Sequence, residues 1–202
     1  MAGADHPYVS RGGLKLAAAL DAFGIDPAGW VCADFGANVG GFTDCLLQRG
    51  ACRVHAIDTG YGDLAWTLRK DPRVVVCERT NVLHAEVAEP VDLVVADLAW
   101  TPQARLAPAA AAWLGPHCRG GLVSLLKPHY ELAKLDRRRP HKTLTEQQRR
   151  EVAETVCGQL NDEGFCVRAL AESPIRGKGG NREFLLWVRP KVDAGDKTPL
   201  ES

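Results

Sequence analysis

The chain has 202 residues, of which 46% are hydrophobic, and its 25 basic side chains are balanced by 25 acidic ones. This length suits one α/β domain with a substantial core and is too short for two large domains. The zero net charge gives no whole-molecule field that attracts nucleic acid, so any basic binding face has to be local.

Seven cysteines lie singly along the chain, without a CxxC pair. An odd number in this arrangement favours reduced thiols in the cytoplasm over a disulfide framework. Most lie in apolar stretches, as Cys32 and Cys77 do, where a thiol acts as a small hydrophobe, so we expect core filling and no metal site. The first residues carry no signal-peptide pattern, and no run of 18 apolar residues occurs, so we expect neither export nor membrane insertion.

In chain order, the first predicted element is a short amphipathic helix at residues 12–24, which carries Lys15 and follows a polar turn. Apolar runs then predict five strands, at residues 31–35, 54–57, 74–77, 91–96 and 122–126. Helical patterns predict helices at residues 42–48, 64–69, 103–114 and 146–161, the last opened by a capping box of Thr145 and Gln148. This alternation of strands and helices predicts a mainly parallel α/β sheet with helices on both faces.

Two further strands are predicted near the C-terminus, at residues 165–171 and 183–188. A glycine-rich segment joins them, so we expect an antiparallel hairpin at the edge of a seven-stranded, Rossmann-like sheet. Before the last helix, residues 134–142 crowd basic side chains around Pro140 and predict an exposed loop. Polar residues at 191–202 predict a flexible tail, which leaves residues 1–190 as a single domain.

A glycine-rich turn follows the first predicted strand, where residues 34–43 read Asp-Phe-Gly-Ala-Asn-Val-Gly-Gly-Phe-Thr. Such a turn lets a ligand approach bare backbone, and its GxxxGG spacing differs from the GxGxxG that faces a pyrophosphate. It therefore suits a cofactor without phosphate. Asp58 ends the next strand, where its carboxylate can accept hydrogen bonds from two ribose hydroxyls. The alternative is that Asp34 and Asp58 only cap helices and the glycines only make a turn.

Three segments together resemble a known family. The sequence Tyr-Val-Ser-Arg-Gly-Gly-Leu-Lys-Leu at residues 8–16, the turn at 34–43 and Glu-Arg-Thr-Asn at 78–81 resemble the TlyA branch of the FtsJ-like ribose 2′-O-methyltransferases. The resemblance spans roughly residues 8–190. It implies a class I methyltransferase sheet and methylation of ribosomal RNA with S-adenosylmethionine as cofactor. The cofactor-binding residues it implies are Asp34, Gly36, Ala37, Gly40, Gly41, Phe42, Asp58, Asn81 and Asp97.

Members of this family use a Lys-Asp-Lys-Glu tetrad, and the resemblance places it at Lys15, Asp97, Lys127 and Glu183. Methyl transfer to a ribose hydroxyl requires alignment of oxygen, methyl and sulfur, and removal of a proton. A lysine acts as a base only where desolvation or a nearby positive charge favours its neutral form. We expect two converging lysines to supply that condition, with Lys127 as the base and Lys15 and Glu183 positioning the substrate. The alternative is a surface salt-bridge network.

The chain departs from the family's usual pattern at two places. TlyA proteins usually begin with a small RNA-binding domain of the S4 type, whereas this chain starts almost directly at Tyr8. The loop after Asp97 reads Leu-Ala-Trp-Thr-Pro in place of the more usual Ser-Phe-Ile-Ser, which indicates a changed substrate contact.

The implied partner is RNA, either ribosomal RNA or a ribosomal subunit. The basic residues Arg11, Arg176, Lys178 and Arg182, with residues 134–142, would track its phosphates or would simply be solvated. Two other functions stay open: a catalytically silent protein that binds cofactor and RNA or ribosomes, and a methyltransferase for a non-RNA substrate. The haemolysin label often attached to TlyA-like proteins would require a membrane-spanning segment, which the sequence lacks.

Overall fold

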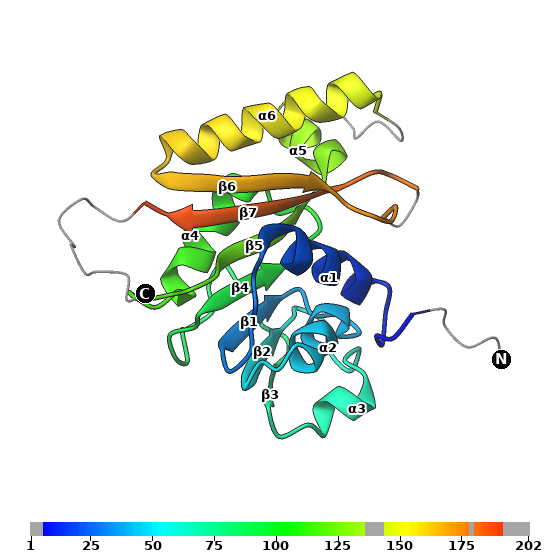
Figure 1. The fold of residues 1–202 in the computed structure, drawn as a ribbon, viewed down its shortest axis with the longest axis vertical. Helices are drawn as coiled ribbons and strands as arrows, with labels where there is room; N and C mark the ends of the chain where they lie inside the picture. The colour runs from blue at the N-terminus through cyan, green and yellow to red at the C-terminus, as the bar shows by residue number, and fades with distance from the viewer. Residues whose placement is uncertain (1–5, 136–143, 178–179, 192–202) are drawn as a thin grey trace.

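The computed structural model describes residues 6–135, 144–177 and 180–191, which fold around one seven-stranded sheet (Figure 1). The strands are β1 (Val31–Phe35), β2 (Arg53–Ile57), β3 (Val74–Cys77), β4 (Leu93–Ala96), β5 (Gly121–Leu126), β6 (Phe165–Glu172) and β7 (Phe184–Pro190). The helices are α1 (Gly12–Phe23), α2 (Gly41–Gln48), α3 (Trp66–Arg69), α4 (Gln103–Trp113), α5 (Pro128–Leu135) and α6 (Glu146–Asp162). The predicted fold class, with its C-terminal antiparallel hairpin at the sheet edge, is confirmed.

The strand order is β3-β2-β1-β4-β5-β7-β6, and the first five strands pair in parallel. The chain runs outward from β1 to β3 and then returns to place β4 against the other side of β1. This reversal creates a crevice at the carboxyl ends of β1 and β4, which is where open α/β sheets bind their ligands. β7 enters antiparallel to β5, so its first residue lies at the same edge.

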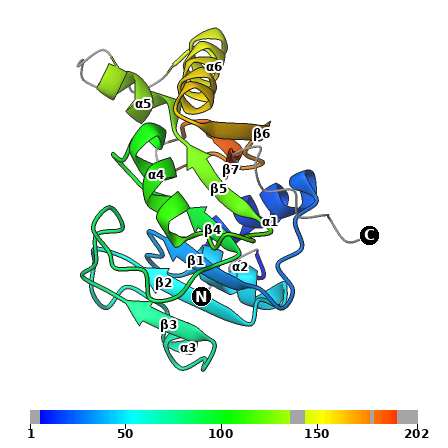
Figure 2. The ribbon, with the colours of Figure 1, turned by 90° about the vertical axis from the view of Figure 1, so that its left-hand side faces the viewer.

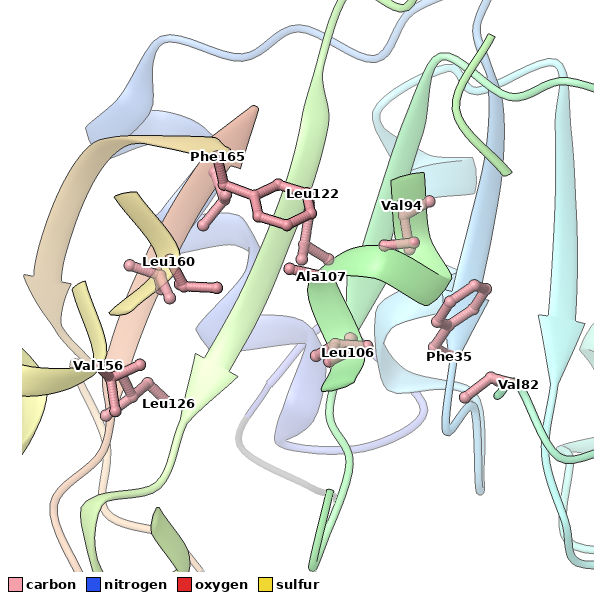
Figure 3. Close-up of a cluster of buried hydrophobic side chains, with 14 of the residues drawn as sticks. Phe35, Val82, Val94, Leu106, Ala107, Leu122, Leu126, Val156, Leu160 and Phe165 are labelled. Carbon is pink, nitrogen blue, oxygen red and sulfur yellow. The ribbon is translucent and has the colours of Figure 1, made fainter. Parts of the chain in front are cut away.

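Helices cover both faces of the sheet because successive strand residues point to opposite sides (Figure 2). On one face, Phe35, Val94 and Leu122 pack with residues of α4 and α6, as Figure 3 shows. On the other face, side chains such as Cys32 and Val95 pack with α1 and α2. Each fully buried side chain of this kind contributes roughly 1.5–3 kcal/mol. The two apolar layers make the sheet a rigid support for the residues at its edge.

Two expectations need correction. Helix α5 was not expected, and its last two residues belong to the segment 134–142 that was predicted as a loop. Pro128 suits the first position of a helix because its missing N–H needs no partner there. The cysteine prediction is right for Cys32 and Cys45, which are buried, and wrong for Cys52, which is exposed. The capping box of Thr145 on α6 is confirmed. The rest of the predicted loop and the predicted tail lie outside the described residues.

Candidate active site

A cavity of about 710 Å³ opens at the carboxyl edge of the sheet. The residues that follow four parallel strands line it: Gly36 after β1, Asp58 after β2, Asp97 after β4 and Lys127 after β5. They meet there because parallel strands direct their carboxyl ends to the same edge. The lining is completed in part by the start of α1 and by the loop before β7.

The turn after β1 forms bare backbone at the floor of the cavity. Gly36 has φ +83°, and a Cβ atom there would lie 2.9 Å from the Asp97 carbonyl oxygen and 2.8 Å from Leu98. Only glycine fits this conformation and this contact. Ala37, Gly41 and Phe42 also line the cavity.

The Asp58 carboxylate is oriented by two backbone donors. Its Oδ2 accepts from the Asn38 N–H at 2.9 Å, and its Oδ1 accepts from the Gly60 N–H at 2.7 Å. Each carboxylate oxygen has a further lone pair, so the group keeps capacity for two hydroxyl donors. Asn81 lines the same cavity. The acceptor oxygens of Asp58 therefore fit a ligand with a ribose diol.

Two residues predicted to bind the cofactor lie behind the cavity wall instead. Asp34 is fully buried, and its Oδ2 accepts hydrogen bonds from the Thr43 N–H at 2.9 Å and the Thr43 hydroxyl at 2.7 Å. Burial raises the pKa of the Asp34 carboxyl to about 7, against the lowering effect of these hydrogen bonds. A Cβ atom on Gly40 would run into Leu68, so this glycine faces a packing contact. Both residues support the turn, and neither lines the cavity.

The four residues of the predicted tetrad line the cavity as two ion pairs. Lys15 Nζ lies 2.5 Å from Glu183 Oε2, with side-chain exposures of 9% and 5%. Lys127 Nζ lies 2.5 Å from Asp97 Oδ1 and donates to the Leu98 carbonyl at 3.2 Å. Glu183 lies beside Lys127 because the β5–β7 register pairs Leu126 with Phe184. Lys15 comes from α1.

Lys15 and Lys127 converge on the same cavity, as expected from the sequence. Each of them also lies against its own carboxylate. Charges as deeply buried as Lys15 and Glu183 require such a partner, because desolvation of an unpaired ion costs several kcal/mol. The cavity is therefore lined by two lysine–carboxylate pairs.

A buried polar network holds the strand end that carries Lys127. The Ser124 hydroxyl on β5 donates to Gln103 Oε1 at 2.8 Å, and the Gln103 N–H at the start of α4 donates to Glu131 Oε1 at 2.9 Å. Burial raises the pKa of Glu131, which sits on α5. The network therefore ties β5, α4 and α5 together around the loop between Asp97 and Gln103.

An aromatic pair at the cavity was not anticipated. The rings of Trp100 and Tyr130 lie 4.4 Å apart between centroids, and both residues line the cavity. Trp100 is 57% exposed and has φ +64°, a strained conformation for a residue with a side chain. His129 lies beside Tyr130 and is buried, which lowers its pKa. The sequence signal was the unusual tryptophan in the loop after Asp97.

The predicted phosphate-tracking residues lie in different places. Arg11 and Arg176 line the main cavity, and Arg182 lies in a smaller hollow next to it. Lys178 lies outside the described residues. Arg149 on α6 also lines the smaller hollow, and the sequence pattern did not single it out.

The sheet order and a cavity floored by a glycine turn with an acid after β2 define a Rossmann-like methyltransferase. Residues 8–189 match the model of the FtsJ-like methyltransferase family, and the chain belongs to this family. It is accordingly a methyltransferase that uses S-adenosylmethionine. When bound, this cofactor supplies a methyl group on a sulfonium, open to attack by a nucleophile. The Asp58 carboxylate fits the ribose of its adenosine part. The bare backbone of the glycine turn leaves room for the rest of the cofactor.

Similar proteins agree with this assignment. TlyA of Mycobacterium tuberculosis, named as a 16S/23S rRNA (cytidine-2′-O)-methyltransferase, is 40% identical over 192 residues, which cover 94% of this chain and 71% of that protein. A solved structure from Streptococcus thermophilus, named as a hemolysin, has a TM-score of 0.84 at 36% identity and covers 95% of this chain and 72% of its own. The N-methyltransferase NodS from Bradyrhizobium japonicum has a TM-score of 0.62 at 18% identity, covers 93% of this chain and 99% of its own, and shares the fold alone.

The hemolysin name of one relative raises the question of a membrane span. Across residues 6–135, 144–177 and 180–191, no helix combines the length and the apolar character that crossing a bilayer requires.

Proposed function

We propose that this protein transfers a methyl group from S-adenosylmethionine to the 2′-hydroxyl of a ribose in ribosomal RNA. The observation that carries the proposal is the pair of lysine–carboxylate ion pairs at the cavity, next to the glycine turn. The printed name of the M. tuberculosis relative supports both the substrate and the position of the methyl group. A ribosomal substrate would also mean that the protein acts in the cytoplasm, on rRNA or on a ribosomal subunit.

In this proposal, Lys127 and Asp97 handle the proton of the attacking hydroxyl. The Asp97 carboxylate at 2.5 Å orients the Lys127 side chain. In its neutral form, Lys127 takes the hydroxyl proton as the oxygen attacks. Lys15 and Glu183 hold the ribose in line with the methyl group, and a rigid pair with exposures below 10% suits that task.

The aromatic pair suits the base of the same nucleotide. A ribose reaches a cavity at the sheet edge only if its nucleotide is unstacked, and an unstacked base needs a new stacking partner. Trp100 offers an exposed indole face beside Tyr130 at the cavity. RNA is therefore favoured over a small molecule or a protein side chain as the methyl acceptor.

We also propose that residues 1–190 act as one catalytic domain. Two sets of contacts support this: α1, which brings Lys15, packs with α2, and it also packs with β7, which follows Glu183. The N-terminal helix therefore belongs to the catalytic unit.

The test is methyl transfer from labelled S-adenosylmethionine to ribosomal subunits purified from a strain that lacks the gene. Replacing Lys127 with alanine removes the base and should lower kcat by about 10²–10⁴-fold, with cofactor affinity unchanged. The matched control is Lys70→Ala, since Lys70 packs over the ring of Trp66 away from the cavity. Mapping of ribose methylation in rRNA with and without the gene identifies the nucleotide.

Undiminished transfer by Lys127→Ala would overturn the mechanism. Cofactor binding by calorimetry without turnover on either subunit would instead favour a silent RNA-binding protein.

A further inference from the structure

A small hollow lies next to the main cavity and is lined by three arginines. Its volume is about 30 Å³, and the arginines that line it are Arg149 on α6 and Arg176 and Arg182 in the loop between β6 and β7. Arg176 and His129 line both the hollow and the main cavity, so the two adjoin. Among the described residues that line the hollow, none is acidic.

Within the described residues, the guanidinium groups of Arg149 and Arg176 each donate to one backbone carbonyl and keep other donors. Arg149 donates from Nη1 to the Leu144 carbonyl at 3.3 Å, and Arg176 donates from Nη1 to the Gly180 carbonyl at 3.0 Å. A guanidinium has five N–H donors in a planar fork, so a single carbonyl bond fixes its direction without using its capacity. The arginines are thus oriented in advance for an acceptor with several oxygens.

Among the residues that the structure describes, the charge around the hollow is only partly balanced. Arg182 pairs with Glu172 at 3.0 Å, but the two side chains are 49% and 40% exposed, so solvent screens this pair. Collecting three positive charges around a small space is unfavourable unless an anion joins them. Planar guanidinium groups match the oxygens of a phosphate well.

The hollow is also close to the reacting groups along the chain. Pro128, which lines it, directly follows Lys127, and Arg182 directly precedes Glu183. The loop that carries Arg176 continues into Gly177, whose backbone packs on the Glu183 carboxylate so closely that a Cβ atom has no room. An anion in the hollow would therefore lie next to a ribose held between the two ion pairs.

We infer that the hollow binds a phosphodiester group of the RNA adjacent to the methylated nucleotide. This inference rests on the proposed function, because a phosphodiester that links the ribose to a neighbouring nucleotide exists only if the acceptor is a polynucleotide. The hollow would bind the RNA backbone next to the target nucleotide. A contact to phosphate does not depend on the base sequence.

The salt dependence of RNA binding tests the inference. Affinity for a fluorescein-labelled single-stranded RNA oligonucleotide is measured by anisotropy over a range of salt concentrations, for the wild type and for Arg149→Gln, Arg176→Gln and the double variant. The plot of log K against log salt has a negative slope. Loss of a phosphate contact should make this slope less steep by about 0.7. The double variant should also show a raised KM for the subunit substrate, and Arg149→Gln should keep its cofactor affinity, because Arg149 does not line the main cavity.

Arg150→Gln is the matched control, because Arg150 neighbours Arg149 on α6 but pairs with Glu146 at 2.8 Å and does not line the hollow. It removes the same charge and should leave the slope unchanged. An unaltered slope in the double variant, or an equal decrease in the control, would overturn the phosphate site while wild-type methyl transfer still supports the proposed function. Failure of the wild type to methylate rRNA would refute the proposed function separately.

Discussion

Single and double substitutions of Lys15 and Glu183 can separate the contribution of this buried ion pair to stability from its contribution to catalysis. Replacing either residue with methionine keeps roughly the same volume but leaves the other charge without a partner at an exposure of 9% or less. Breaking a buried pair from one side costs about 3–5 kcal/mol, whereas replacing both partners with apolar side chains is often neutral. We therefore expect each single variant to lose about 3–5 kcal/mol of unfolding free energy and the double variant to stay within about 1 kcal/mol of the wild type.

Urea denaturation of the four proteins without cofactor measures this coupling, with the same slope m required throughout. Omitting the cofactor matters because a ligand of the native state would raise the apparent stability. Methyl transfer should be lost in all three variants, including the stable double variant. Additive losses within about 0.5 kcal/mol would show that the two charges are not coupled. Wild-type turnover by the double variant would show that the pair serves folding only.

Three further predictions concern single residues. The pKa of Asp34 is about 7 in the folded protein, above its value in the unfolded chain. Between about pH 4 and 7 the folded protein therefore binds more protons than the unfolded chain. The free energy of unfolding should fall by up to about 4 kcal/mol as the pH rises over this range. Asp34→Asn should flatten that dependence in urea titrations at each pH; an unchanged profile would contradict the assignment. Trp100→Gly should relieve about 1 kcal/mol of strain at φ +64°, yet raise the KM for RNA at least about fivefold through loss of stacking; an unchanged KM would exclude the stacking role. Asp58→Asn should weaken cofactor binding in calorimetry by about 10–100-fold with RNA affinity intact, and equal cofactor affinity would exclude a ribose contact.

Much of the fold could be predicted from local pattern. Runs of apolar residues marked the strands, because a strand buried between two helix layers must be apolar on both faces. The glycine turn and the acid after β2 were visible for the same local reason, since each depends on its place relative to one strand end. Helix α5 escaped prediction because it begins at a proline, Pro128, and its last residues belong to the basic segment that the charge pattern assigned to a loop.

The contacts within the site depended on distant parts of the chain. Lys15 and Glu183 are separated by 168 positions, and only the β5–β7 register and the packing of α1 bring them together. Asp34 has the sequence position of a ligand contact, but its side chain points into the protein, toward Thr43.

The sequence by itself determined the sheet, its two apolar faces and the residues that end its strands, because each of these is written in a short stretch of chain. Only the tertiary structure decided which charges pair and which face the cavity. Each of the two lysines in the cavity lies against a carboxylate from a distant part of the chain, and Arg149 lines the same hollow as Arg176 and Arg182. The physical reason is that a side chain's partners are set by the register and packing of elements far apart in sequence, which local periodicity does not encode.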